Sequence, residues 1–347
     1  MPSRAFLGGL GGVSILGFVL AACGGGSSTA AVGGDGGGGG DDSGVTGGGD
    51  GSTGGDGAAG GDGGTNGDAS SGKAIKTIFL ILMENHNWSA IKGAATAPYI
   101  NGLLATGAHA EQYFNPPGMH PSEPNYIWLE AGGNLGITND SDPSTNHKPN
   151  TDHLVTQLET AGVTWKHYVE DITGTTCPLT SSGLYGAKHS PMVFFDDVTG
   201  TNSPTSQRCI AHIRPYTELA GDLTMNKIAQ YNFITPNLCN DMHGALQCAT
   251  NNIQTGDTWL SVLVPKIQAS QAYIDGGAIF ITWDESEGGD HPVGMIVLSK
   301  SAKVGYMNSL AYTHSSMLRT VETVFGVPFL RDAANAKDLG DLFTTFP

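Results

Sequence analysis

The sequence predicts an α/β protein, a three-layer sandwich with a mostly parallel central sheet and a disordered N-terminal tether. Two unbroken apolar runs, Ile78–Met83 and Ala278–Trp283, are rich in β-branched and aromatic residues. Such runs suit strands that are covered on both faces. Candidate helices alternate with the strands, which indicates a sheet with helices on both faces.

The remaining elements follow from periodicity and stop signals. Helices are expected over residues 97–107, 152–162 and 258–270, two of which end near a glycine. A further, amphipathic helix is expected over residues 315–327. Residues 163–171 alternate like a strand, and a further apolar run covers residues 293–298. Residues 177–248 look loop-rich, and we expect them to form an elaboration over the sheet edge.

The N-terminal segment predicts export. Arg4, the short apolar stretch Leu7–Leu20 and the ending "LAAC" are typical of a bacterial lipoprotein signal over residues 1–23, with Cys23 lipidated after cleavage. The alternative is an uncleaved membrane helix, for which the stretch is short and broken by glycines. We therefore expect lipid anchoring to the bacterial cell envelope, in the periplasm or at the outer membrane or cell surface.

Residues 24–73 form the predicted tether. Gly24–Gly72 consists almost entirely of Gly, Asp, Ser, Thr and Ala, so it offers hardly any apolar side chain to bury. A segment of this composition stays disordered and acts as a flexible linker. Residues 74–347 are long enough and apolar enough for one large domain.

The charge of the chain narrows the range of partners. The formal net charge is −16, and the part beyond the tether is acidic as well. An acidic surface disfavours nucleic acid or an anionic membrane surface as the main partner. We therefore expect no nucleic-acid binding.

The cysteines indicate an oxidising compartment. Beyond Cys23 the sequence has four, and an even number in an exported chain suggests two disulfides. Pairing nearest neighbours gives Cys177–Cys209 and Cys239–Cys248. A zinc site is the alternative, but no pair has the two-residue spacing that zinc favours.

Polar side chains follow both of the long apolar runs. Glu84 and Asn85 come after the first, and Asp284 and Glu285 after the second. Functional groups of parallel α/β sheets gather beyond the carboxyl ends of strands. Carboxylates brought together there repel one another, and a divalent cation with oxygen ligands removes that cost. The alternative is that these are ordinary strand-end residues that face solvent.

Ser122 is the candidate nucleophile. It lies just before Pro124 and the helical stretch "NYIWLEAG", so it is placed either to cap a helix or to expose its hydroxyl at the positive helix end. A serine beside a metal can be activated without a His-Asp relay. Asn125 could bind a phosphate or simply belong to the helix start.

Three histidines are further candidates. His189 and His243, the latter close to Asp241, could bind the metal, contact the substrate or protonate a leaving group. His120 gains weight as a substrate contact because it lies close to Ser122 in the sequence. For each of them the alternative is a histidine with no role in chemistry.

Taken together, these stretches resemble the bacterial phosphoesterase family of acid phosphatases and non-haemolytic-type phospholipases C, in the alkaline phosphatase-like superfamily. The matching pieces occur in family order across residues 75–330: "ILMENHNW", "APYINGL", "HPSEPNYIWLEAGG", "KHSPMVFF", "FITPNLCNDMHG", "GDTWL", "FITWDESEG" and "YTHSSMLRTVETVFGVPFL". The spacing is similar to that of compact members related to secreted acid phosphatases. The resemblance implies an alkaline phosphatase-like catalytic domain over residues 74–347.

The resemblance also implies roles for the site residues. The divalent metal would be held by Glu84, Asn85, Asp284 and Glu285. Ser122 would be the nucleophile, and His189 and His243 would contact the phosphate or the leaving group. The family often has two aspartates where this chain has Asp284-Glu285, so the second carboxylate is displaced by a methylene group.

The expected function is metal-dependent hydrolysis of phosphate monoesters through a phosphoserine, with a substrate that can be lipid-linked. One alternative is a phospholipase C that cuts lipid phosphodiesters, although no long insertion would obviously build a hydrophobic groove. An alternative of another class is a non-catalytic surface lipoprotein that binds an anionic ligand. Such a binder has no need of a nucleophile.

Overall fold

The computed structural model describes residues 72–347. The predicted signal segment, the lipidated Cys23 and nearly all of the tether lie outside these residues. Within residues 72–347, no helix combines the length and the apolarity needed to cross a bilayer.

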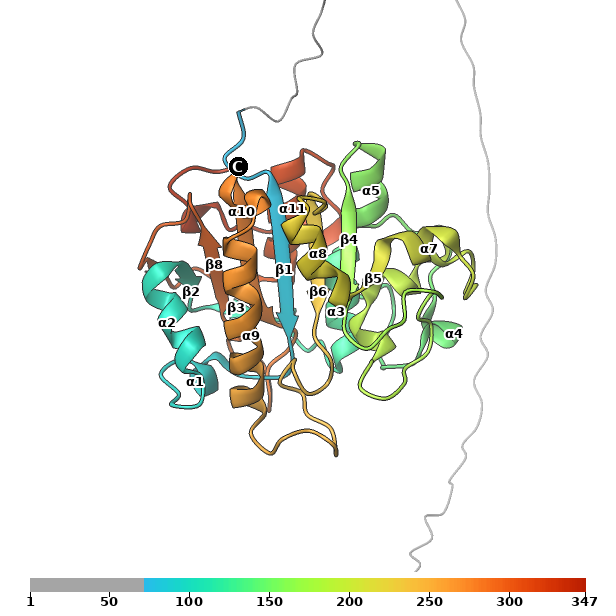
Figure 1. The fold of residues 1–347 in the computed structure, drawn as a ribbon, viewed down its shortest axis with the longest axis horizontal. Helices are drawn as coiled ribbons and strands as arrows, with labels where there is room; N and C mark the ends of the chain where they lie inside the picture. Colours follow the sequence, from blue (N-terminus) through green and yellow to red (C-terminus); the bar gives the residue numbers. More distant parts are fainter. Residues whose placement is uncertain (1–71) are drawn as a thin grey trace, which may run out of the picture. The chain divides into compact units, whose positions relative to one another are not determined.

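An eight-stranded sheet with the order β5-β4-β6-β1-β7-β8-β2-β9 forms the centre of the fold (Figure 1). Its first five strands are parallel, as expected for a mostly parallel sheet. These strands are β5 (Ile213–Pro215), β4 (Trp165–Val169), β6 (Tyr231–Thr235), β1 (Thr77–Met83) and β7 (Gly277–Trp283).

The remaining strands continue the sheet or lie beside it. β8 (Met295–Ser299) is antiparallel to β7, and β2 (Ala108–Ala110) is antiparallel to β8 and parallel to β9 (Met307–Asn308). A separate small sheet pairs β3 (Tyr113–Phe114) with β10 (Tyr312–Thr313).

Helices cover both faces of the sheet. One layer, in front in Figure 1, holds α2 (Pro98–Thr106), α8 (Leu219–Thr224), α9 (Asn252–Gln268) and α10 (Gln271–Ile274). The other layer holds α3 (Ser122–Ala131), α5 (Leu154–Thr160) and α11 (His314–Phe325), which contact one another. The short helices are α1 (Trp88–Ile91), α4 (Pro143–Asn146), α6 (Asp196–Thr199) and α7 (Gln207–His212), with 3₁₀ turns η1 (Ala187–His189), η2 (Pro191–Phe194), η3 (Tyr216–Glu218), η4 (Arg331–Asn335) and η5 (Gly340–Leu342).

Local chemistry explains why the longer helices begin and end where they do. α11 starts with a capping box between Thr313 and Ser316 and stops at Gly326, whose φ of 71° is left-handed. The N-terminus of α2 is capped from α9, because the carboxylate of Asp257 accepts hydrogen bonds from the backbone N–H groups of Tyr99 and Ile100.

The register of β1 and β7 positions the site. Every residue of β7 is buried, and so is every residue of β1 after the first, as expected for central strands of a covered sheet. Met83 pairs with Trp283 at the carboxyl ends. The polar residues that follow the two strands therefore emerge side by side.

The expectation for residues 177–248 is wrong in one respect. This segment does supply short helices and the edge strand β5, but it also contains β6, which lies between β4 and β1 in the middle of the sheet. Every residue of β6 is buried, and the polar Asn232 interrupts the apolar run that a covered strand usually shows. The Nδ2 group of Asn232 donates to the carbonyl oxygens of Ile78 and Ala229, so both of its donors are satisfied inside the sheet.

Two disulfides join segments that follow β4 and β6 in the chain. The structure pairs Cys177 with Cys209 and Cys239 with Cys248. This is the pairing of nearest neighbours that the sequence suggested. Both bonds are consistent with a protein that folds in an oxidising compartment.

Candidate active site

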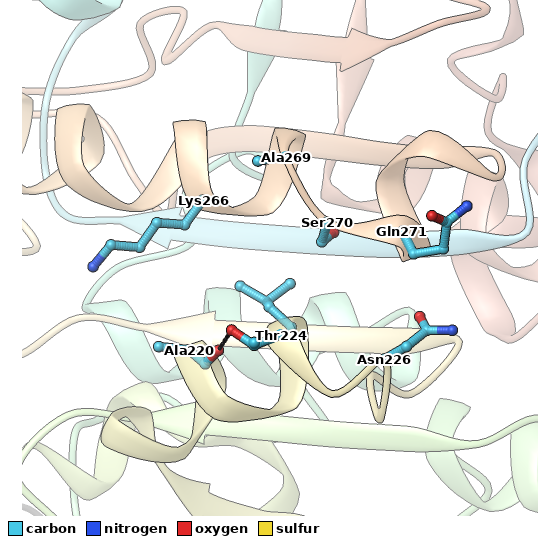
Figure 2. Close-up of a pocket in the computed structure, with 8 residues that line it drawn as sticks. Ala220, Thr224, Asn226, Lys266, Ala269, Ser270 and Gln271 are labelled. Atoms are coloured by element: carbon cyan, nitrogen blue, oxygen red, sulfur yellow. Dashed lines mark hydrogen bonds between the residues drawn. The ribbon is translucent and has the colours of Figure 1, made fainter.

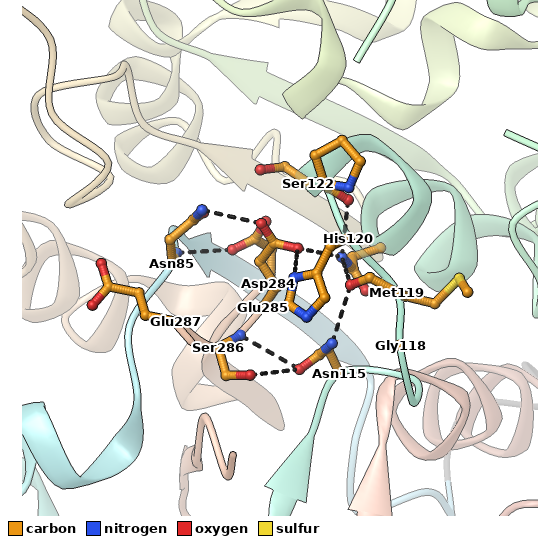
Figure 3. Close-up of polar contacts among 12 residues, drawn as sticks. Asn85, Asn115, Gly118, Met119, His120, Ser122, Asp284, Glu285, Ser286 and Glu287 are labelled. Atoms are coloured by element: carbon orange, nitrogen blue, oxygen red, sulfur yellow. Dashed lines mark hydrogen bonds and ion pairs between the residues drawn. The ribbon is translucent and has the colours of Figure 1, made fainter. Parts of the chain in front are cut away.

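The residues that follow β1 and β7 form a cluster of carboxylates and one amide (Figure 3). The backbone N–H of Asn85 donates to Oδ1 of Asp284 at 2.9 Å, and its side-chain Nδ2 donates to Oε1 of Glu285 at 3.1 Å. Glu84 and Asp284 are fully buried, and Glu285 nearly so. Two stretches of chain 200 residues apart therefore meet at one point.

Ser122 faces this cluster from the start of α3. Its Oγ donates a hydrogen bond to Oε2 of Glu84 at 3.0 Å. Ser122 is the first helical residue, while Pro121 occupies the N-cap position and no side chain caps the helix from there. The Ser122 side chain thus does not cap α3, and its hydroxyl is directed at the carboxylates.

Glu84 forms a buried ion pair with His189, which also lies close to Asp241. His189 Nε2 is 3.3 Å from Oε1 of Glu84, and His189 Nδ1 is 3.5 Å from Oδ2 of Asp241. Burial alone would lower the pKa of His189, but the charge of Glu84 and the hydrogen bond of Asp241 raise it to about 9. Burial would likewise raise the pKa of Glu84, but His189 lowers it to about 2. His189 is therefore a cation that compensates buried carboxylates.

The two predicted substrate contacts, His120 and Asn125, both contact a carboxylate of the cluster. His120 Nδ1 lies 2.7 Å from Oε2 of Glu285, and Asn125 Nδ2 donates to the same oxygen at 3.3 Å. Burial and the charge of Glu84 raise the pKa of Glu285 to about 7, although His120 opposes the shift. Both side chains border the cluster and support Glu285.

His243 is placed differently from His189. Its side chain is exposed, Nδ1 donates to the carbonyl oxygen of Gly244, and its ring centre lies 6.1 Å from that of His189. The backbone N–H of His243 donates to Asp241 Oδ1 at 2.7 Å. His243 thus stands at the solvent side of the site and His189 at its buried side.

The donor set of the cluster suits a hard divalent cation. Oδ2 of Asp284 and Oδ1 of Asn85 are buried and have no hydrogen-bond partner. Burial and the charges of Glu84 and Glu285 hold the pKa of Asp284 well above its usual value. Unpartnered oxygens among repelling carboxylates are the features that a cation relieves.

The carboxylates of the cluster are not arranged as a closed metal site. Among residues 72–347, no group of three or more His, Cys, Asp or Glu side chains has metal-binding geometry. The carboxylates are instead hydrogen-bonded to Ser122, Tyr126 and His120. Side-chain rotation can rearrange such a network, whereas the two buried oxygens without a partner still need one.

Three residues of the site were not predicted from the sequence. Tyr126 donates its hydroxyl to Oε1 of Glu84, and a signal existed, because Tyr126 lies one helical turn after Ser122. Lys188 and Asp140 form an ion pair of 2.8 Å near the start of α3. Nothing in the spacing of Asp140 within its loop could have indicated this contact.

A surface pocket lies away from the carboxylate cluster. A pocket of about 540 Å³ between α8 and α9 is lined by residues such as Thr224, Lys266 and Ser270 (Figure 2). These residues lie near the amino ends of β6 and β7, whereas the carboxylate cluster lies at the carboxyl ends. We therefore assign the chemistry to the cluster.

Solved structures with the same architecture define the class of protein. A protein of the alkaline phosphatase superfamily from Vibrio parahaemolyticus superposes with a TM-score of 0.51 at 10% identity, covering 77% of this chain and 72% of that one. The lipoteichoic acid synthase LtaP from Listeria monocytogenes gives 0.52 at 11% identity, covering 76% of each chain. The fold is thus alkaline phosphatase-like.

Sequence comparison identifies the family. The chain belongs to the Phosphoesterase family, whose sequence model matches residues 93–328. It is 30% identical over 277 residues to a phosphatidylinositol-3-phosphatase of Mycobacterium tuberculosis, covering 79% of this chain and 85% of that protein. A phosphate-repressible acid phosphatase of Penicillium chrysogenum is 25% identical, covering 75% of this chain and 61% of that protein. The protein is therefore a phosphoric ester hydrolase.

Proposed function

We propose that the protein is a metal-dependent phosphatase that hydrolyses phosphate monoesters through a phosphoserine on Ser122. The observation that carries the proposal is the 3.0 Å hydrogen bond from Ser122 Oγ to Glu84, beside the unpartnered Oδ2 of Asp284. A non-catalytic binder would not need a buried hydroxyl directed at a carboxylate cluster. A serine hydroxyl at the start of a helix, beside a cluster of carboxylates, suits nucleophilic displacement at phosphorus.

The proposed metal ligands are Glu84, Asn85, Asp284 and Glu285. A divalent ion held there would neutralise the carboxylates and supply positive charge next to the phosphate. The chain itself orients the nucleophile, because Glu84 accepts the hydrogen bond of Ser122 and fixes the direction of Oγ. His189 and Tyr126 in turn hold Glu84 in place.

Two steps follow from this arrangement. Oγ of Ser122 attacks phosphorus in line, its proton passes to the Glu84 carboxylate that accepts its hydrogen bond, and the bond from phosphorus to the leaving alcohol oxygen breaks. His243, at the solvent side of the site, is the group placed to give that oxygen a proton. In the second step water attacks the phosphoserine and its proton is taken up by His243, while the bond from phosphorus to Oγ breaks and Glu84 returns the proton to Oγ, which releases phosphate and restores the Ser122 hydroxyl.

The decisive experiment is turnover of p-nitrophenyl phosphate by protein lacking the tether. We expect phosphate release that stops when a chelator is added and returns with divalent metal. Ser122→Ala should abolish turnover without lowering the melting temperature. Ser299→Ala should leave turnover unchanged, because Ser299 on β8 pairs with Ala278 near the amino end of β7, away from the cluster. Full activity of Ser122→Ala would refute the proposal. Phosphatidylinositol 3-phosphate belongs in the substrate panel because a relative is named for it.

The proposed location is the cell envelope, through a lipid on Cys23. The two disulfides support export, and the lipoprotein-like signal supports anchoring. Expressed with its full N-terminus, the protein should fractionate with membranes, and Cys23→Ser should release it. Membrane retention of the Cys23→Ser variant would exclude lipidation at this residue.

A further inference from the structure

An ion pair stands at the start of the helix that carries Ser122. Lys188 Nζ donates to Oδ2 of Asp140 at 2.8 Å, and Oδ1 of the same carboxylate accepts the backbone N–H of Glu123 at 3.0 Å. Asp140 therefore connects Lys188 to the residue next to Ser122. The Lys188 side chain is 19% exposed, so it is largely enclosed but still reaches solvent.

This contact changes what the start of α3 can offer to a phosphate. A helix N-terminus usually binds anions through its free N–H groups. Here the N–H of Glu123 is taken by Asp140, and Pro124 has none. A phosphate on Ser122 therefore finds fewer backbone donors than the sequence suggested, and it needs a donor from elsewhere.

Lys188 has the free capacity to be that donor. An ammonium group carries three N–H donors, and one hydrogen bond to Asp140 is the contact that its Nζ makes in the structure. Its neighbour in the chain, His189, lies 3.3 Å from Glu84, and the carboxylate that Lys188 binds also holds the residue next to Ser122. Lys188 therefore lies at the edge of the same site.

We propose that Lys188 binds the phosphate group of the substrate and makes the site prefer dianionic monoesters to singly charged diesters. The inference rests on the proposed function of Ser122. Nζ keeps its hydrogen bond to Asp140 and donates a second one to a phosphate oxygen. A fixed cation attracts a doubly charged group more strongly than a singly charged one, so removing it should penalise the monoester more.

The test compares p-nitrophenyl phosphate with bis(p-nitrophenyl) phosphate. Loss of one charge-assisted hydrogen bond should lower kcat/KM for the monoester about 10- to 100-fold in Lys188→Met. The kcat/KM of Lys188→Met for the diester should change far less. Inorganic phosphate should also inhibit this variant more weakly than it inhibits the wild-type protein. Lys188→Arg should recover part of the monoester activity. Lys166→Met is the matched control, because Lys166 pairs with Asp222 and is 25% exposed but lies at the amino end of β4.

A structural role would give another pattern. If Lys188 serves only to hold Asp140, then Lys188→Met and Asp140→Asn should lower both esters equally and reduce the melting temperature alike, and the proposal is overturned. If the wild-type protein hydrolyses neither ester, the phosphatase proposal fails instead. In that case the role of Lys188 is tested without turnover, by measuring the affinity for inorganic phosphate calorimetrically. Lys188→Met should weaken phosphate binding and Lys166→Met should not.

Discussion

The ring of Tyr126 stacks on the ring of His189, with centres 5.0 Å apart and planes 13° from parallel. The Tyr126 hydroxyl also donates to Glu84, which forms the ion pair with His189. One tyrosine therefore contacts both members of the buried pair. It fixes the carboxylate that receives the Ser122 hydrogen bond.

Tyr126→Phe should test this supporting role. Phenylalanine keeps the stacking but removes the hydroxyl, so Glu84 loses one of the groups that orient it. Loss of a group that orients a metal ligand costs about 10- to 100-fold in metal affinity or activity. We expect a loss in that range when activity is titrated with metal ion. Tyr185→Phe is the control, because its hydroxyl donates to the carbonyl oxygen of Pro178. Equal metal affinity in Tyr126→Phe and wild type would contradict the assignment.

Glu285 is the predicted ligand whose length departs from the family pattern. Both of its oxygens are engaged, Oε1 with Asn85 and Oε2 with His120 and Asn125. Glu285→Gln removes the negative charge and should weaken metal binding at least about 10-fold, on the scale of groups that tune a metal site. Glu285→Asp keeps the charge and should retain most of the affinity. Calorimetric metal titration separates the two, and unchanged affinity in Glu285→Gln would remove this residue from the ligand set.

The residues of the candidate site could be predicted from the sequence, but the contacts between them could not. Two buried runs ending in acids could be read directly, but their meeting depends on β1 and β7 being neighbours, which no local pattern encodes. The same limit applies to β6, where a buried Asn232 interrupts an otherwise apolar strand. Its carbonyl partners are supplied by β1 and a loop, so its place in the sheet follows from tertiary contacts.

Residues that support the candidate site were harder to predict than the strand-end residues. Ser122 was recognised at a helix start, yet its hydroxyl donates to a carboxylate because Pro121 takes the cap position. Asp140 comes from a loop without periodicity, and its partners Glu123 and Lys188 lie 17 and 48 residues away. Contacts of this kind depend on how loops pack in the tertiary structure, so sequence spacing does not reveal them.

Removing each disulfide in turn should affect stability and activity to different degrees. Chain-entropy arguments assign about 4 kcal/mol to Cys177–Cys209, which spans 32 residues, and about 3 kcal/mol to Cys239–Cys248, which spans 9. The shorter loop carries Asp241 and His243. Replacing Cys239 and Cys248 by alanine should therefore lower kcat/KM more than replacing the other pair, although it destabilises less. Denaturant unfolding and kinetics on both double variants check this, and the reverse order of activities would contradict it.

Stability should also depend on pH through Glu322, which is fully buried on α11. Oε1 accepts the N–H of Leu330 at 2.7 Å, while Oε2 is buried without a partner. Burial raises the pKa of Glu322 from 4.5 to about 8. Because the folded pKa lies above the unfolded one, the neutral carboxyl contributes its full stability below about pH 4.5, and this contribution is lost as the pH rises towards 8.

Glu322→Gln removes this titration, so its effect should change with pH. Any packing cost of the amide is the same at every pH, whereas the wild-type protein is destabilised by ionising the carboxyl only as the pH rises. The melting temperature of the variant relative to wild type should therefore increase by several degrees between pH 5 and pH 8. Glu287→Gln, at a side chain that is 62% exposed, is the control and should show no such trend. A constant difference between Glu322→Gln and wild type over this range would show that the buried carboxyl does not titrate there.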